Sequence, residues 1–123
     1  MNLDRFESSD CWLLLSIGFS KRGASIKEII SSGDTYNHSI FTLDELNYGM
    51  SKLIHNGYVE RKNDRFFLME KAKLFYKAHE IHWEGCIQTL SRLSPIFQKE
   101  TAKPGCNLSI YFVQDENGTI HAA

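Results

Sequence analysis

The stretch FTLDELNYGMSKLIHNGYVERKNDRFFLM, residues 41–69, decides the fold expected of this 123-residue chain. Thr42 is a helix-capping residue, and Glu45 follows three positions later, which is the spacing of a capping box. Apolar residues then recur at helical spacing until an Asn-Gly pair gives a stop signal. After that pair the pattern changes to two short strands joined by a charged turn. The stretch therefore predicts a capped helix over residues 43–56 and a β-hairpin over residues 58–68.

Two further helices are expected before this stretch. The first begins near Ser8 and has an almost all-round apolar surface, which predicts burial on more than one side. The second begins at Ser25, where Glu28 completes another capping box, and ends at Gly33. Residues 34–41 are then expected to form a polar loop. The predicted order of elements is helix, helix, helix, hairpin.

After the hairpin, a long helix is expected over residues 70–94, because apolar side chains alternate four and three positions apart in a heptad-like seam. Pro95 should interrupt this helix, since proline lacks a backbone donor and clashes with the preceding turn. Residues 103–105 indicate a linker, and residues 108–113 indicate a strand. The Asn-Gly pair at 117–118 favours a tight turn, although few residues remain for a returning strand.

The composition sets limits on the class of protein. The chain has 14 Lys and Arg against 15 Asp and Glu, so its net charge of -1 gives no general attraction to nucleic acid. Three widely spaced cysteines form no disulfide framework, which favours a reducing compartment. The polar, acidic start is unlike a signal peptide, and no apolar run is long enough to span a bilayer. We expect one cytoplasmic domain that does not bind a membrane.

Three pieces of this pattern together resemble the winged helix-turn-helix superfamily, especially small uncharacterised bacterial regulator-like proteins. The pieces are Thr42-x-x-Glu45-Leu46, the run LIHNGYV at 53–59 and the run RFFL at 65–68. Many relatives continue with a Leu-Thr-x-x-Gly segment, whereas residues 68–72 of this chain read LMEKA.

The resemblance covers roughly residues 10–80. It implies an α+β winged-helix fold, with a three-helix core and a β-hairpin wing, followed by the long helix and the strand-like tail. We therefore expect a winged-helix domain over residues 1–80 and a C-terminal extension over residues 81–123.

In DNA-binding relatives, the helix that matches residues 43–56 enters the major groove, and the wing touches the DNA backbone or minor groove. The resemblance thus implies a DNA-binding, transcription-regulator-like protein whose partner is double-stranded DNA. The side chains expected to face outward on the helix are Asn47, Tyr48, Ser51, Lys52 and His55. The expected phosphate contacts of the wing are Arg61, Lys62 and Arg65.

The alternative is a winged-helix module that binds another protein and not DNA. The nearly neutral net charge favours it, and so do Asp44 and Glu45 at the helix start, where base contacts usually concentrate. Both carboxylates could also serve only to stabilise the helix N-terminus. Similarly, the charged hairpin could be a solvated element that protects a sheet edge.

The seam of the predicted long helix suggests a homodimer, because it carries more apolar surface than a three-helix core needs. The residues expected at this dimer interface are Tyr76, Trp83, Cys86, Leu90 and Leu93. The alternative is that the strand at 108–113 folds back and covers the seam within one chain.

A metal site and catalysis have little support in the sequence. On one helix, His79, His82 and Cys86 would share a face, and imidazole and thiolate suit zinc, copper or nickel. His79 and Cys86 also belong to the apolar seam, so we interpret them as core residues and expect no metal and no cofactor. The chain has no Gly-rich phosphate loop, nucleophile elbow or His-Glu-x-x-His motif, and we do not expect an enzyme.

Overall fold

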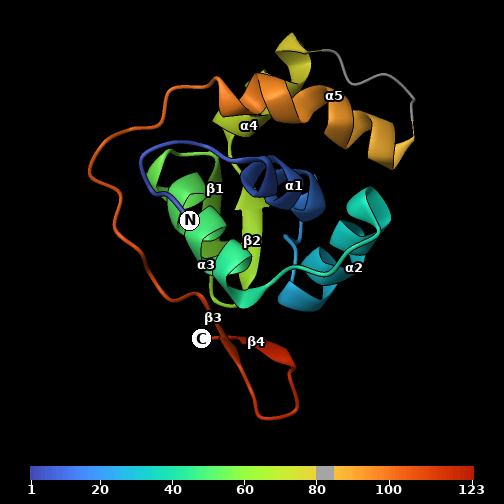
Figure 1. Cartoon of the computed structure of the whole chain (residues 1–123), viewed down its shortest axis with the longest axis vertical. Coiled ribbons are helices and arrows are strands. Elements are labelled where there is room, and N and C mark those ends of the chain that lie inside the picture. The colour runs from blue at the N-terminus through green and yellow to red at the C-terminus, as the bar shows by residue number, and fades with distance from the viewer. Residues whose placement is uncertain (80–84) are drawn as a thin grey trace.

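The computed structural model describes residues 1–79 and 85–123 and has an α+β architecture (Figure 1). Its elements are α1 (Ser8–Ile17), α2 (Ile26–Asn37), α3 (Leu43–His55), β1 (Val59–Lys62), β2 (Arg65–Leu68), α4 (Glu70–Ala78), α5 (Cys86–Gln98), β3 (Phe112–Gln114) and β4 (Ile120–Ala122). Figure 1 shows α4 and α5 at one end of the molecule and the β3–β4 hairpin at the other. None of the helices in the described ranges is long and apolar enough to cross a membrane.

The helix and hairpin predicted from residues 41–69 are confirmed. The Thr42 hydroxyl accepts a hydrogen bond from the Glu45 amide at 3.1 Å, and the Glu45 carboxylate accepts one from the Thr42 amide at 2.9 Å. This capping box fixes the start of α3. Strands β1 and β2 then pair in antiparallel register, with Val59 opposite Leu68.

A third short segment extends the β1–β2 sheet. Ala24 and Phe66 form an antiparallel bridge, in which each backbone amide donates to the carbonyl of the other residue at 2.8 and 2.9 Å. The chain between α1 and α2 is thereby held against the hairpin. This contact brings residues 19–21 close to Phe67 and Leu68 of β2.

Helix α2 is longer than predicted, because it continues through Gly33 to Asn37. Gly33 is needed for packing and does not end the helix: a Cβ built there would lie 2.4 Å from the Phe41 ring. His38 ends α2 in the left-handed conformation, with φ of 47°. Consequently, much of the loop expected at residues 34–41 is helical.

The single long helix expected over residues 70–94 is wrong. Helix α4 ends at Ala78, and α5 starts at Cys86 after Gly85, whose extended backbone has φ of -60° and ψ of 154°. Pro95 does not end α5, since it lies inside that helix. The domain boundary expected at residue 80 falls among the residues that lie outside the described ranges.

The core surrounds α1, which is buried along nearly its whole length, as its all-round apolar surface predicts. Helices α2, α3 and α5 and strand β2 all pack against it. Phe6, Tyr58 and Phe97 form a ring cluster beside it, with centroids 4.6 to 5.7 Å apart. The C-terminal tail adds Phe112, which is fully buried against the Phe66 ring at 5.3 Å.

Candidate interaction surface

The outer face of α3, on which DNA contacts were expected, is covered by the C-terminal tail. Asn47 binds the tail backbone with both ends of its amide. Its Oδ1 accepts hydrogen bonds from the Tyr111 and Phe112 amides, each at 2.9 Å, and its Nδ2 donates to the Phe112 carbonyl at 3.1 Å. Because an amide group both donates and accepts, it can pair with an extended backbone as a neighbouring strand would.

Ser51 and His55, one and two turns further along α3, also contact the tail. The Ser51 hydroxyl accepts from the Ser109 amide at 2.9 Å and lies 3.2 Å from the Ser109 carbonyl, to which it donates. One turn later, His55 Nε2 lies 3.0 Å from the Pro104 carbonyl oxygen. We call Asn47, Ser51 and His55, together with the tail backbone that they contact, the α3–tail contact.

Asn56 closes this contact at the end of α3. Its Oδ1 accepts from the Lys103 amide at 2.6 Å, and its Nδ2 donates to the Lys52 carbonyl at 2.7 Å. The tail is therefore held over residues 103–112 mainly through its backbone. Asn47 and Ser51 lie on this outer face but are buried beneath the tail, so the expectation that they are open to DNA is wrong, while Tyr48 and His55 are half-buried.

Lys52 is not open to DNA either, because its side chain is fully buried. Its Nζ lies 2.6 Å from Asp10 Oδ2 and 3.1 Å from Glu7 Oε1, and it donates to the Arg5 carbonyl at 3.2 Å. A buried charge of this kind persists only when it is paired and hydrogen-bonded. Lys52 thus fixes the N-terminal segment to α3 and is not available to DNA in this conformation.

The pKa values of the two acids in this cluster, Asp10 and Glu7, are shifted in opposite directions. Burial raises the pKa of Asp10, although the hydrogen bond from Lys52 opposes the shift. Partial burial also acts to raise the pKa of Glu7, but the hydrogen bonds from the Asn2 amide and from Lys52 outweigh it and lower that pKa. Asp10 Oδ1 is buried and has no hydrogen-bond partner among the residues that the structure describes. The fully buried Asp10 is therefore the more costly of the two acids to keep charged.

Two of the three wing cations are engaged within the chain. Arg61 donates to the carbonyls of Asn63 and Ala123, both at 2.6 Å, and lies 5.8 Å from the centroids of two aromatic rings. Arg65 donates to the Gly23 carbonyl and to the Glu28 carboxylate, both at 3.1 Å. Lys62 is exposed and forms no ion pair with any residue that the structure describes.

The seam expected at a dimer interface is largely used inside the chain. Tyr76, Leu90 and Leu93 are buried in the core, where α5 packs against α1 and α2. Cys86 is half-buried at the start of α5, and Trp83 lies outside the described residues. Among the residues that the structure describes, Leu90 and Leu93 are thus covered by the packing of α5 against the core.

The residues considered as metal ligands do not share one helix. His79 caps the end of α4, with its ring 4.7 Å from that of Phe75, whereas Cys86 opens α5. His82 lies outside the described residues. Within the described ranges, no three His, Cys, Asp or Glu side chains are arranged to hold a metal ion.

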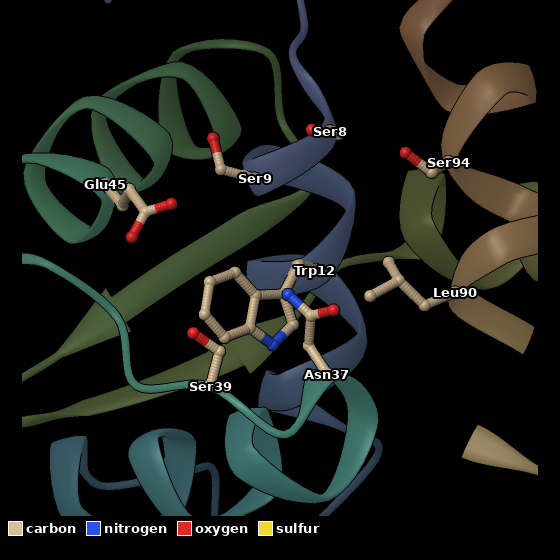
Figure 2. A pocket seen from close by; sticks show the side chains of 8 residues that line it. All are labelled: Ser8, Ser9, Trp12, Asn37, Ser39, Glu45, Leu90 and Ser94. Atoms are coloured by element: carbon tan, nitrogen blue, oxygen red, sulfur yellow. The ribbon is translucent and has the colours of Figure 1, made fainter. Parts of the chain in front are cut away.

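A polar hollow of about 240 Å³ lies where α1, α3 and α5 approach the end of α2 (Figure 2). Figure 2 shows the Trp12 ring in its centre, with Ser8 and Ser9 on α1 and Leu90 and Ser94 on α5. The Trp12 indole already has partners within the chain. Its Nε1 donates to the Gly33 carbonyl at 2.8 Å, and its ring stacks on the Phe41 ring with 3.7 Å between centroids. The other lining residues are Asn37, Ser39 and Glu45. Glu45 already belongs to the capping box of α3, so we assign this hollow no ligand.

Sequence reasoning missed the α3–tail contact, although one signal for it was present. Asn47, Ser51 and His55 recur every four residues and form a polar stripe on α3. Amide, hydroxyl and imidazole groups can bind base edges, but they bind a peptide backbone equally well. The stripe therefore indicates a binding face without identifying what occupies it. No protein-family model, curated protein or solved structure gives a significant match to this chain.

Proposed function

We propose that this chain is a winged-helix module that binds another protein, and that it does not read DNA with α3. The proposal rests on one observation: the tail over residues 103–112 occupies the outer face of α3 and satisfies its polar side chains. A helix in a major groove contacts base edges with its outer face. Because the tail covers that face of α3, α3 cannot lie in a major groove in this conformation.

The order of elements supports the winged-helix part of the proposal. Three helices precede the β1–β2 hairpin, and Ala24 adds a short third segment to that sheet. Because α3 directly precedes the hairpin, it corresponds to the recognition helix of the superfamily that the sequence resembles, and the hairpin corresponds to the wing.

The charges near α3 also favour a protein partner. Asp44 is exposed at the start of α3 and would face phosphates in a major-groove complex. Of the three wing cations, Arg61 and Arg65 already form hydrogen bonds within the chain, which leaves few cations to neutralise a DNA backbone. A protein surface does not require a dense line of cations.

The test pairs a DNA assay with a peptide selection on the full chain. Fluorescence anisotropy with a pool of labelled genomic fragments at low salt should show no saturable binding. Phage display of random peptides should enrich sequences that bind the chain saturably. Saturable, salt-sensitive DNA binding that is lost in an Arg61→Ala/Lys62→Ala/Arg65→Ala variant would overturn the proposal in favour of a DNA-binding regulator.

A further inference from the structure

We propose that a groove between the α1–α2 connection, β2 and α4 docks an acidic peptide segment that inserts one apolar side chain. The inference rests on the proposed function and names the partner's chemistry. The groove has a volume of about 220 Å³ and is lined by Phe19, Ser20, Lys21, Phe67, Leu68 and Lys73. We call it the lysine–phenylalanine groove.

Its apolar centre is held in place by the backbone. The Phe67 ring lies directly on Gly23, where a Cβ would come within 2.7 Å of the ring, and Gly23 adopts the positive φ of 73° that favours glycine. On the other side, the Phe19 ring meets the Tyr76 ring edge to face at 5.1 Å. Phe19 is nevertheless 54% exposed, so an apolar surface is presented to solvent between two supported rings.

The rim of the groove is positively charged. Lys21 and Lys73 are exposed and line it from the α1–α2 connection and from α4. Lys62 lies over the Phe67 ring, with its Nζ 5.5 Å from the ring centroid. Among the residues that the structure describes, none of these three lysines has an acidic partner within ion-pair distance. Lys21 and Lys73 in the lining of the groove and Lys62 on the Phe67 ring are complementary to carboxylates beside an apolar side chain.

Two observations favour a peptide, the first over a small molecule and the second over a nucleic acid. A volume of about 220 Å³ is smaller than the roughly 300–1,000 Å³ typical of sites for whole small molecules, and it suits a single side chain. In addition, Glu60 is the register partner of Phe67 and lies on the same face of the hairpin. A carboxylate at that point would repel a continuous phosphate backbone but can be avoided by a peptide with separate acidic residues.

The experiment measures binding of fluorescein-labelled synthetic peptides to the full chain. The probe is a ten-residue peptide in which a Leu-Phe pair is flanked by Asp and Glu. Its control has Asn and Gln in place of the acids, and a single-stranded oligothymidine represents nucleic acid. We expect saturable binding of the acidic peptide that weakens with added salt, and at least about tenfold weaker binding of the Asn/Gln control.

A matched pair of variants locates the site. Lys21→Glu/Lys73→Glu should weaken binding of the acidic peptide by at least about tenfold. Lys27→Glu/Lys99→Glu makes the same change in net charge at exposed positions outside the groove lining and should leave binding unchanged. Phe19→Ala removes the exposed ring without altering charge and should weaken binding as well. All these side chains are exposed, and circular dichroism of each variant checks that it is folded.

Three results would overturn the inference: equal binding of the acidic and Asn/Gln peptides, equal loss in both charge-reversal variants, or oligothymidine that displaces the acidic peptide from the groove. If display-selected peptides bind the wild type and Lys21→Glu/Lys73→Glu equally well, the assignment of the groove fails while the proposed function stands. If the chain binds genomic DNA and no peptide, both fail.

Discussion

The side-chain amide of Asn47 on α3 pairs with the backbone of Phe112 in the tail. Oδ1 accepts from the Phe112 amide at 2.9 Å, and Nδ2 donates to the Phe112 carbonyl at 3.1 Å. The two residues are 65 positions apart in the chain. The pairing holds the Phe112 ring against the core, and it places the tail over the face of α3 that would otherwise be open to a partner.

Replacing Asn47 should therefore destabilise the whole domain. Asn47→Ala removes three hydrogen bonds and leaves the buried Phe112 amide without a partner, which should lower the free energy of unfolding by roughly 2 kcal/mol or more. Urea denaturation followed by Trp fluorescence measures the loss. The control is Asp44→Asn on the exposed start of the same helix, with an expected change below about 1 kcal/mol. Equal stabilities of the wild type and Asn47→Ala would mean that the tail is not held by this side chain.

The buried Lys52 cluster makes a second prediction. Lys52→Met leaves the fully buried Asp10 without its cation and should cost about 3–5 kcal/mol of unfolding free energy. Adding Asp10→Asn removes the uncompensated charge and should recover part of that loss. Chemical denaturation of the single and double variants checks this. A double variant that is less stable than Lys52→Met would show that Asp10 contributes through something other than its charge.

Alkaline pH should weaken the fold through Cys11. Burial raises the pKa of this thiol to about 12, and nearby Asp10 adds to the rise. An unfolded thiol has a pKa of about 8.5, so above that pH the unfolded chain binds fewer protons than the folded chain. The free energy of unfolding should then fall as pH rises from about 8.5 toward 12, by up to about 1.4 kcal/mol per pH unit.

Denaturant titrations at about pH 8 and about pH 9 measure that slope. In this range an unfolded tyrosine, whose pKa is about 10, is still mostly protonated, so Tyr58, whose pKa is raised to about 12 by burial, adds little. Cys11→Ala should be less stable than the wild type at about pH 8, because it loses a buried side chain, and it should lack the part of the slope that comes from the thiol. Parallel pH profiles for the wild type and Cys11→Ala would contradict the assignment.

The burial of Tyr76, Leu90 and Leu93 inside the chain predicts a monomer in light scattering at micromolar concentration. For the same reason, Leu93→Asp should unfold or aggregate, because it places a carboxylate in the core. A wild-type dimer that Leu90→Asp converts into a folded monomer would show instead that this seam is an interface between two copies.

The parts of the fold that the sequence predicts well are those set by near neighbours in the chain. The capping boxes at Ser25 and Thr42 and the turn between β1 and β2 each depend on residues only a few positions apart. Gly33 shows where such local signals mislead, because it was expected to end a helix and instead makes room for the Phe41 ring.

The candidate site could not be predicted in the same way, because its contacts join distant segments. The partners of Lys52 lie 42 to 47 positions away, and those of Asn47 and Ser51 lie 58 to 65 positions away. A lysine and an asparagine on a helix look equally suited to solvent, to DNA or to a buried network. Only the tertiary arrangement distinguishes these roles.

Amide hydrogen exchange at Ser109, Tyr111 and Phe112, resolved by NMR, shows whether the tail covers the outer face of α3 in solution. If the tail occupies the outer face of α3, these three amides are protected in the wild type. In Asn47→Ala, the protection of Tyr111 and Phe112 then drops by more than the protection of the α1 amides, which falls only by the loss of global stability. Exchange of all three amides at the rate of an unstructured peptide in the wild-type chain would show that the face of α3 is open, and would contradict the account.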